Sequence, residues 1–521
     1  MKRAGSSCSD RTALFLWKFI ANNTKTMARN NAAAALREKI GYGLGDMSSS
    51  MFWKIFSYYL PFFYSNVFGL SLAHAGTLML VTKLYDAVSD PVMGLIADRT
   101  HSRWGKYRPY LLWIAVPFAV AGVLTFFTPQ TDSYTFKHIY AYLTYILMMT
   151  VYTAINVPYG AMLGVVTDDS REKSVFSSFR MFFAFIGSFI AMGLFEPLLR
   201  LRGKMAGTLP EGWTIGDSSP MDWTVAMIII GVCCAALFIA SFAFTKENVR
   251  EDHEVAGNDP IEEFALTREQ VREDIESSGK SSSSILSDLK ALVSNGPWWM
   301  LLGGGIAILL FNSIRGGAAA YYFADVLGTN SIFTLAAFLT AGEVAQLAGV
   351  CVTVPVSERI GKKNTFISVL IFITILSVLI MFLPETKGGM WALMIFQVLI
   401  CIAIGINSPL LWSMFADVAD YSEVKNGSSS TGLIFSSSSM AQKFGAAFGS
   451  AIVLWVLMAF GYDNAKGAVQ TPEALGTIKA LISWIPALGS ILGLAAMSFY
   501  PLTDRKMVEI HKELKEIRKQ R

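Results

Sequence analysis

Charged residues are scarce in this sequence: Asp, Glu, Lys and Arg make up 16% of the 521 residues, whereas an average soluble domain contains roughly 25%. Hydrophobic residues account for 53%, and the mean hydropathy is +0.45. The net charge of +4 is too small to indicate a nucleic-acid partner. A chain this apolar is typical of a protein embedded in a lipid bilayer, which is the environment that we expect.

Several functional classes lack their usual residues here. No G-x-x-x-x-G-K-[ST] segment occurs, so ATP-driven transport would require another subunit. The five His residues include no pair at metal-ligand spacing, and four of the five Cys residues lie inside apolar runs without such spacing. We therefore expect no catalytic residues, no cofactor and no metal ion other than a coupling Na⁺.

Twelve apolar runs of the sequence are long enough to cross a bilayer, because a hydrocarbon core requires ~20 residues of helix. Lipid offers no partner to backbone polar groups, so we expect these runs to be helical. The runs cover residues 41–66, 74–97, 108–128, 138–166, 176–199, 223–245, 297–324, 331–355, 364–384, 389–415, 430–460 and 476–500.

A polar segment rich in Asp, Glu, Lys and Ser separates six apolar runs from six more. Basic residues gather in the loops after the second, fourth and eighth runs and in the C-terminal tail, so the positive-inside rule places both termini in the cytoplasm. The predicted organisation is a cytoplasmic extension at 1–38 (with Met27 as an alternative initiator), a six-helix bundle at 39–245, a cytoplasmic loop at 246–294, a second six-helix bundle at 295–500 and a basic cytoplasmic tail at 501–521.

The two halves carry similar residues at the ends of corresponding runs. Residues 98–106 (DRTHSRWGK) follow the second run, and residues 358–363 (ERIGKK) follow the eighth. Matching halves are typical of a duplicated transporter. We predict that acidic and basic clusters at these ends close the cytoplasmic side through ion pairs; the alternative is that they are ordinary helix-end charges. The predicted gate residues are Asp98, Arg99, Arg103, Lys106 and Asp420.

Nine ionisable residues from the apolar runs suggest a function, because a charge in lipid is costly. Four are acids and five are bases, so we expect them to neutralise one another around a central cavity. Asp86 and Asp90 are four residues apart, which places their Cβ atoms about 5–6 Å apart on one helix face. Two such carboxylates cannot both ionise cheaply in a low dielectric, which predicts a cation or proton site; the alternative is a static salt-bridge network. The nine residues are Asp46, Lys54, Lys83, Asp86, Asp90, Arg180, Arg315, Glu343 and Lys443.

Other residues in the runs suit a ligand that is rich in hydroxyl groups. Tyr152, Thr153 and Asn156 precede Pro158, which frees a backbone carbonyl in the preceding turn. The planar donor fork of Arg180 can hold sugar hydroxyls, or it can simply pair with an acid. Aromatic rings that can stack on a sugar are Trp53, Tyr152 and Trp412, although an aromatic residue in an apolar run often only packs.

Residues 86–109 closely resemble the corresponding motif of the glycoside–pentoside–hexuronide cation symporter family, which includes melibiose permease and belongs to the major facilitator superfamily. The resemblance extends over about residues 40–500, with supporting stretches at 42–46, 314–323 and 416–423. It implies an all-α membrane protein of twelve helices in two six-helix bundles, with alternating access, a sugar site between the bundles and a cation site on the second helix.

The resemblance also implies roles for particular residues. Asn156 stands where sodium-using melibiose carriers have an acid, which favours H⁺ over Na⁺ as the coupling ion. Ser50 stands in place of the family's sugar-binding aspartate, and Gly160 in place of its stacking Trp, so a galactoside is not implied. The implied cation-binding residues are Asp86, Asp90, Ser89, Thr153 and Lys443. Together with the residues singled out above, the predicted substrate-binding residues are Asp46, Ser50, Trp53, Tyr152, Asn156, Arg180 and Trp412.

These observations predict a secondary active transporter that moves a sugar or glycoside together with H⁺ or Na⁺. We expect it in a bacterial-type inner membrane, with the lipid bilayer and a small sugar as partners and with no nucleic acid and no obligate protein partner. One alternative is a carrier or exporter of a non-sugar solute on the same fold. A second is a membrane-embedded enzyme or sensor.

Overall fold

The computed structural model describes residues 35–100, 102–167, 170–207, 213–247, 292–328, 331–426, 431–465 and 468–520. Within these ranges the chain is helical and has no strand. Most of the predicted extension at 1–38 and of the predicted loop at 246–294 lies outside the described residues.

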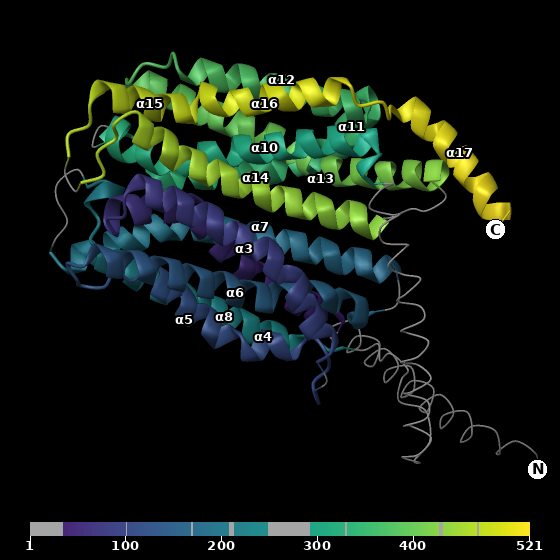
Figure 1. Ribbon diagram of the computed structural model, residues 1–521, viewed down its shortest axis with the longest axis horizontal. Helices are drawn as coiled ribbons and strands as arrows, with labels where there is room; N and C mark the ends of the chain where they lie inside the picture. Colours follow the sequence, from purple (N-terminus) through teal and green to yellow (C-terminus); the bar gives the residue numbers. More distant parts are fainter. Residues whose placement is uncertain are drawn as a thin grey trace, which may run out of the picture.

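The helices lie side by side along one long axis, with the first half of the chain on one side and the second half on the other (Figure 1). The first half comprises a helix over residues 35–58 (the first helix), α2 (Leu60–Phe62), η1 (Phe63–Val67), α3 (Leu72–Asp98), α4 (Pro109–Trp113), α5 (Ala115–Thr125), α6 (Tyr134–Val166), α7 (Ser170–Met205), η2 (Ile215–Asp217) and α8 (Pro220–Phe244). The second half comprises α10 (Gly296–Tyr321), η3 (Tyr322–Leu327), α11 (Leu335–Ile360), α12 (Lys362–Ile380), α13 (Lys387–Asn426), α14 (Thr431–Ala459), α15 (Pro472–Ile482), α16 (Trp484–Ser498) and α17 (Asp504–Gln520).

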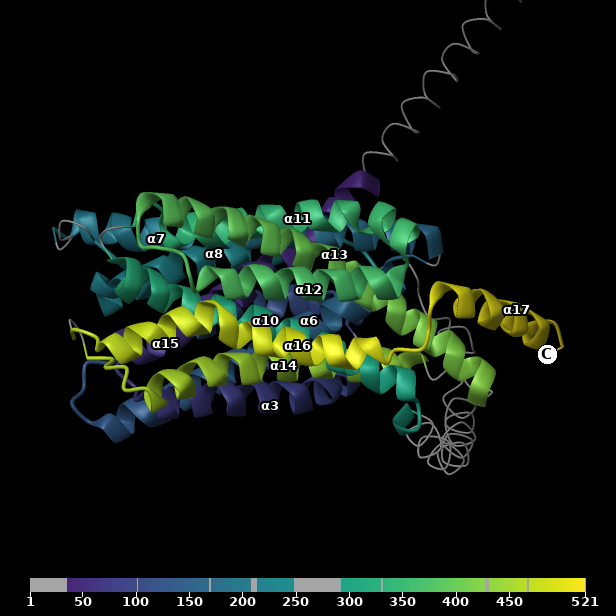
Figure 2. The ribbon, with the colours of Figure 1, turned by 90° about the horizontal axis from the view of Figure 1, so that it is seen from above.

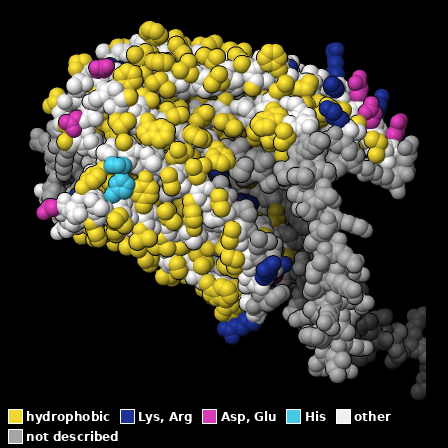
Figure 3. Space-filling model, viewed as in Figure 1, with side chains coloured by type: hydrophobic (Ala, Val, Ile, Leu, Met, Phe, Trp, Pro, Cys, Tyr) yellow, Lys and Arg dark blue, Asp and Glu magenta, His cyan; other side chains and the backbone are white. Residues whose placement is uncertain are grey.

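The surface of the molecule is apolar along the sides of its helices. On the face shown in Figure 3, hydrophobic side chains cover the middle, and most charged side chains lie toward the two ends. α17 marks one of these ends in both ribbon views (Figures 1 and 2). An apolar belt between polar ends fits a bilayer that surrounds the helices.

Eight of the described helices are long and apolar enough to cross a membrane by length and composition, so the chain is a multi-pass membrane protein. The other four predicted runs lie on the first helix, α3, α5 and α14, and the count of twelve spans stays a prediction. The eight are Tyr134–Leu163, Val175–Met205, Pro220–Phe244, Gly296–Leu327, Leu335–Ile360, Lys362–Ile380, Lys387–Lys425 and Pro472–Ser498.

Among the helix pairs that join the halves, α3 packs against α14 and α7 packs against α11. α3 and α11 contain the second and eighth predicted runs, which are the second helices of their halves. Each of these two pairs therefore contains the second helix of one half, as expected for a duplicated chain. This packing brings α3 and its acids Asp86 and Asp90 to the interface between the halves.

In both halves the repeated sequence at the α17 end places a glycine with a positive φ angle beside a carboxylate from a later segment. Gly105 and Gly361 have positive φ angles of 111° and 88°. Glu247, just after α8, accepts hydrogen bonds from the backbone N–H groups of residues 106–108 at 2.7 to 2.8 Å. Asp504, just after α16, accepts one at 3.2 Å from the residue that follows the second glycine. A Cβ on either glycine would lie 2.3 Å from the neighbouring carboxyl group, which explains the two glycines.

Replacing Glu247 by Ala is expected to lower the free energy of unfolding by about 2 kcal/mol, because three backbone N–H groups lose a charged acceptor. Thermal unfolding of the purified protein in detergent measures this loss. Glu385→Ala is the matched control, because Glu385 is half-exposed in a surface pair with Lys479 and is expected to contribute less than about 1 kcal/mol. Equal effects of the two substitutions would contradict the role of Glu247.

Candidate cation and substrate site

A cavity of about 540 Å³ lies between the two halves. The first helix, α3, α6 and α7 form one side of its wall, and α10 and α14 form the other. The structure thereby brings together most of the residues that the sequence singled out for cation and substrate binding. Those on the wall are Asp46, Ser50, Trp53, Asp90, Tyr152, Thr153, Asn156, Arg180 and Lys443.

The acidic pair of α3 shares two partners from other helices. The Thr153 hydroxyl of α6 lies 2.9 Å from Asp86 Oδ1 and 3.1 Å from Asp90 Oδ1. The Lys443 ammonium of α14 lies 3.1 Å from Asp86 Oδ2 and also pairs with Asp90. Ser89 lies between the two acids and approaches the Thr153 hydroxyl at 3.3 Å. The five predicted cation-site residues therefore form one contiguous cluster.

The local sequence explains how this cluster forms. Asp86, Ser89 and Asp90 are spaced i, i+3, i+4, so they share one face of α3. That helix packs between α6 and α14, which supply the hydroxyl and the ammonium. Carboxylate and hydroxyl oxygens are the ligands of hard cations, and a carboxylate also accepts a proton. In the structure the ammonium of Lys443 contacts both carboxylates, and cation binding there stays a prediction.

A second ammonium lies close to the acidic pair. Lys83 is buried, and its Nζ lies 3.7 Å from the centre of the Trp53 ring, a cation–π arrangement. Lys83 precedes Asp86 by three residues on α3, so it lies on the same side of the helix. Trp53 in turn lies on the cavity wall beside Tyr152, with their ring centres 5.9 Å apart. The aromatic wall of the cavity is thus connected to the charged cluster.

The other charged pair on the cavity wall joins the first helix to α7. Arg180 Nε donates a hydrogen bond to Asp46 Oδ2 at 3.1 Å. Arg180 therefore pairs with an acid and also lies on the cavity wall, and its binding of sugar hydroxyls stays a prediction. Asn156 Nδ2 donates to the Tyr152 carbonyl at 3.2 Å. Trp412 lies apart from these residues and lines a smaller neighbouring pocket.

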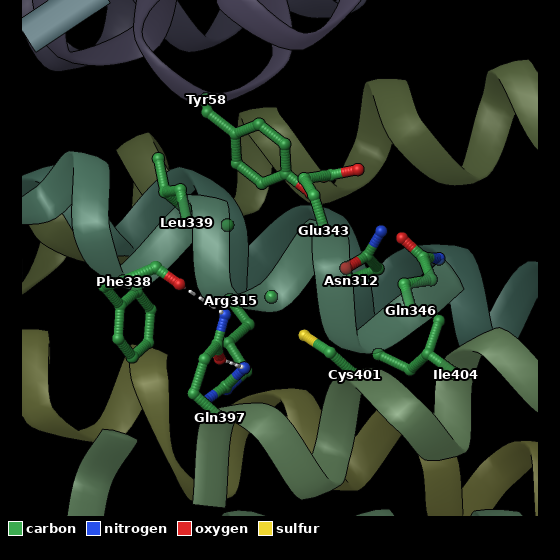
Figure 4. Close-up of a pocket in the computed structure, with 12 residues that line it drawn as sticks. Tyr58, Asn312, Arg315, Phe338, Leu339, Glu343, Gln346, Gln397, Cys401 and Ile404 are labelled. Atoms are coloured by element: carbon green, nitrogen blue, oxygen red, sulfur yellow. Dashed lines mark hydrogen bonds between the residues drawn. The ribbon is translucent and has the colours of Figure 1, made fainter. Parts of the chain in front are cut away.

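The prediction that the buried charges neutralise one another is confirmed for most of them. Lys54 of the first helix and Glu343 of α11 form an ion pair across the halves, with Nζ and Oε1 2.5 Å apart. Sequence reasoning noted both residues as costly charges but did not pair them or place them at the site. Figure 4 shows Glu343 beside Tyr58, whereas Arg315 turns toward Gln397, to which it donates a hydrogen bond.

The predicted gate residues lie at the α17 end. Arg99 and Arg103 are exposed there, and the Arg103 guanidinium lies 4.3 Å from the centre of the Trp104 ring. Lys106 is half-buried, and Asp420 lies 3.2 Å from His511 of α17, within the same half. The side chain of Asp98 lies outside the described residues. Closure by ion pairs between the halves stays a prediction.

At the opposite end, neutral polar residues join the halves. Both first helices of the halves continue into a π-helix there, η1 and η3, and such segments are frequent at functional sites. The Ser65 hydroxyl lies 2.7 Å from the Tyr321 hydroxyl, and Asn66 donates to the Tyr462 hydroxyl at 2.6 Å. Asn464 donates to the carbonyl of Ser65 at 2.8 Å. The sequence did not single out these residues, because a neutral polar group near the end of a helix costs little energy, unlike a charge within an apolar run.

The model of the "MFS/sugar transport protein" family matches residues 41–273 and again residues 261–504. The chain belongs to this family. The two matches leave only the terminal segments uncovered, and they confirm the all-helical major-facilitator fold and the family expected from the α3 motif.

Relatives in this family are similar over nearly the whole chain. YagG of Escherichia coli (strain K12), whose name describes a glycoside/cation symporter, is 35% identical over 92% of this chain and 95% of its own. The isoprimeverose transporter of Lactiplantibacillus pentosus is 32% identical over 89% of this chain and 88% of its own. The inner membrane symporter YicJ of Escherichia coli (strain K12) is 31% identical over 92% of this chain and 95% of its own.

Solved transporter structures share the fold at low sequence identity. The nucleoside transporter NupG superposes with a TM-score of 0.56 over 90% of this chain and 99% of its own, at 14% identity. A proton-dependent oligopeptide transporter superposes with a TM-score of 0.58 over 92% of this chain and 99% of its own, at 13% identity. At such identities the likeness concerns the fold alone.

Proposed function

We propose that the chain is a secondary active transporter that carries a sugar or glycoside together with H⁺ or Na⁺ by alternating access. The observation that carries this proposal is the acidic pair of buried Asp86 and part-exposed Asp90, which shares one hydroxyl and one ammonium beside a cavity between the halves. The names of YagG and of the isoprimeverose transporter support a glycoside and a cation as its substrates.

Coupling follows from competition for the same carboxylate oxygens. Lys443 belongs to the second half, whereas Asp86 and Asp90 belong to the first. A bound proton or Na⁺ satisfies the carboxylates and releases the ammonium, which weakens the contact of α14 with α3. The position of the halves and the occupancy of the cation site are then linked, and a sugar that prefers the cation-bound arrangement raises cation affinity by the same factor.

The sugar binds across the Asp46–Arg180 pair in this proposal. The carboxylate accepts hydrogen bonds from hydroxyl groups, and the guanidinium donates to them. Trp53 and Tyr152 provide the apolar surface for the C–H face of a sugar ring.

Asn156, which carries no charge, favours H⁺ as the coupling ion. Both termini, and therefore the α17 end, are assigned to the cytoplasmic side of a bacterial inner membrane.

Uptake into proteoliposomes tests the proposal, with Na⁺ and H⁺ gradients imposed separately and a panel of radiolabelled mono- and disaccharides that includes isoprimeverose. We expect one gradient to drive accumulation of at least one sugar and an ionophore for that ion to abolish it. Sugar movement that ignores both gradients would refute coupling. Accumulation of a non-sugar solute alone would favour the alternative of a different carrier.

A further inference from the structure

A second, smaller pocket adjoins the central cavity on the side of the second half. It has a volume of about 90 Å³ and lies among α10, α11 and α13. Leu309 and Asn312 line both spaces, so the pocket is a side chamber of the central cavity. Its polar lining consists of Asn312, Gln346, Asn407 and Ser408, and Trp412 contributes an aromatic ring.

Asn407 is the unusual residue of this chamber. Its side chain is only 1% exposed, and neither its Nδ2 nor its Oδ1 has a hydrogen-bond partner among the described residues. A buried donor or acceptor without a partner destabilises a fold by roughly 1–3 kcal/mol. Two such atoms on one side chain therefore destabilise the fold considerably. A ligand with both donors and acceptors, bound in the chamber, removes that cost.

The rest of the lining defines the chemistry of such a ligand. Figure 4 shows the amide groups of Asn312 and Gln346 next to each other, and both residues line the chamber. Every polar residue of the lining is neutral, so a charged ligand would find no counter-charge there. Amides and a hydroxyl pair with both the donor and the acceptor side of an alcohol. Trp412, one turn after Ser408 on α13, offers the apolar face that a sugar ring also needs.

We propose that this chamber is a second sugar subsite and that the substrate is therefore a neutral glycoside with at least two rings. One ring binds at Asp46 and Arg180 in the first half, and the next binds at Asn407, Gln346 and Trp412 in the second. This inference rests on the proposed sugar transport. It assigns the second half a share in substrate recognition, so that the substrate itself bridges the two halves.

Binding of matched sugars to the purified transporter in detergent, measured by titration calorimetry, tests the inference. The probes are the disaccharides isoprimeverose, xylobiose and cellobiose and the methyl glycosides of their constituent sugars. We expect at least one disaccharide to bind about tenfold or more tightly than either matching methyl glycoside. Asn407→Leu, which keeps the size of the side chain, is expected to weaken binding of that disaccharide about tenfold and to leave the methyl glycoside within about twofold.

Two further variants make this test decisive. Gln346→Met is expected to repeat the selective loss from another helix, in case Asn407→Leu does not fold. Asn364→Leu is the matched control, because Asn364 is exposed at the start of α12, and this variant is expected to bind both sugars normally. Equal weakening of disaccharide and methyl glycoside by the chamber variants would overturn the subsite. Accumulation of a monosaccharide without any preference for disaccharides would also overturn the subsite. A complete lack of sugar binding and of gradient-driven uptake would instead refute the proposed function itself.

Discussion

Asp86→Asn is expected to abolish accumulation of sugar against a gradient while leaving exchange of sugar across the membrane measurable. Asp86 is fully buried, and it shares the Thr153 hydroxyl and the Lys443 ammonium with Asp90. Asparagine has the same shape and can still accept a hydrogen bond from the hydroxyl. The substitution removes the charge that a coupling cation neutralises, so the ratio of internal to external sugar should fall to about one at steady state.

Two assays on the same proteoliposomes separate these outcomes. Gradient-driven uptake reports coupling, and counterflow with preloaded sugar reports exchange without a gradient. Asp132→Asn is the matched control, because Asp132 is exposed in a loop and does not line the cavity, and accumulation by this variant should equal that of the unmodified protein. Normal accumulation by Asp86→Asn would remove Asp86 from the coupling step, and loss of both activities would indicate a structural role.

The acidic pair could be predicted from the sequence because its geometry is local. Residues four apart on a helix share a face whatever the rest of the chain does, and the cost of a charge in lipid marks them as functional. The resemblance to the symporter family over about residues 40–500 added the partners Thr153 and Lys443. The family and the all-helical fold followed from the same features together with the apolar runs.

The contacts between the halves could not be predicted in this way. Lys54 and Glu343 are 289 residues apart, and sequence spacing does not tell which helices face each other. Asn407 gave no signal, since a neutral amide in an apolar run costs far less than a charge. The contacts at the end opposite α17 involve Ser65, Asn66 and Tyr462, which are common residues at the end of any membrane helix.

Breaking the Lys54–Glu343 pair on one side only is expected to destabilise the protein by about 3 kcal/mol, because the remaining charge is left buried without its partner. The side chains of Lys54 and Glu343 are 18% and 7% exposed, and the pair joins the first helix to α11. Lys54→Met and Glu343→Gln should therefore each lower the free energy of unfolding. The double variant removes both charges, and it should lose less than the sum of the two single losses.

Thermal unfolding in detergent of the unmodified protein and the three variants gives the coupling energy of the pair. The same cycle on the half-exposed surface pair Lys479 and Glu385 serves as the control, where coupling should stay below about 1 kcal/mol. Strictly additive losses at Lys54 and Glu343 would show that the two charges do not depend on each other. Strong coupling would instead mean that the pair of Lys54 and Glu343 holds the halves together beside the central cavity, in addition to the contacts of Lys443 with Asp86 and Asp90.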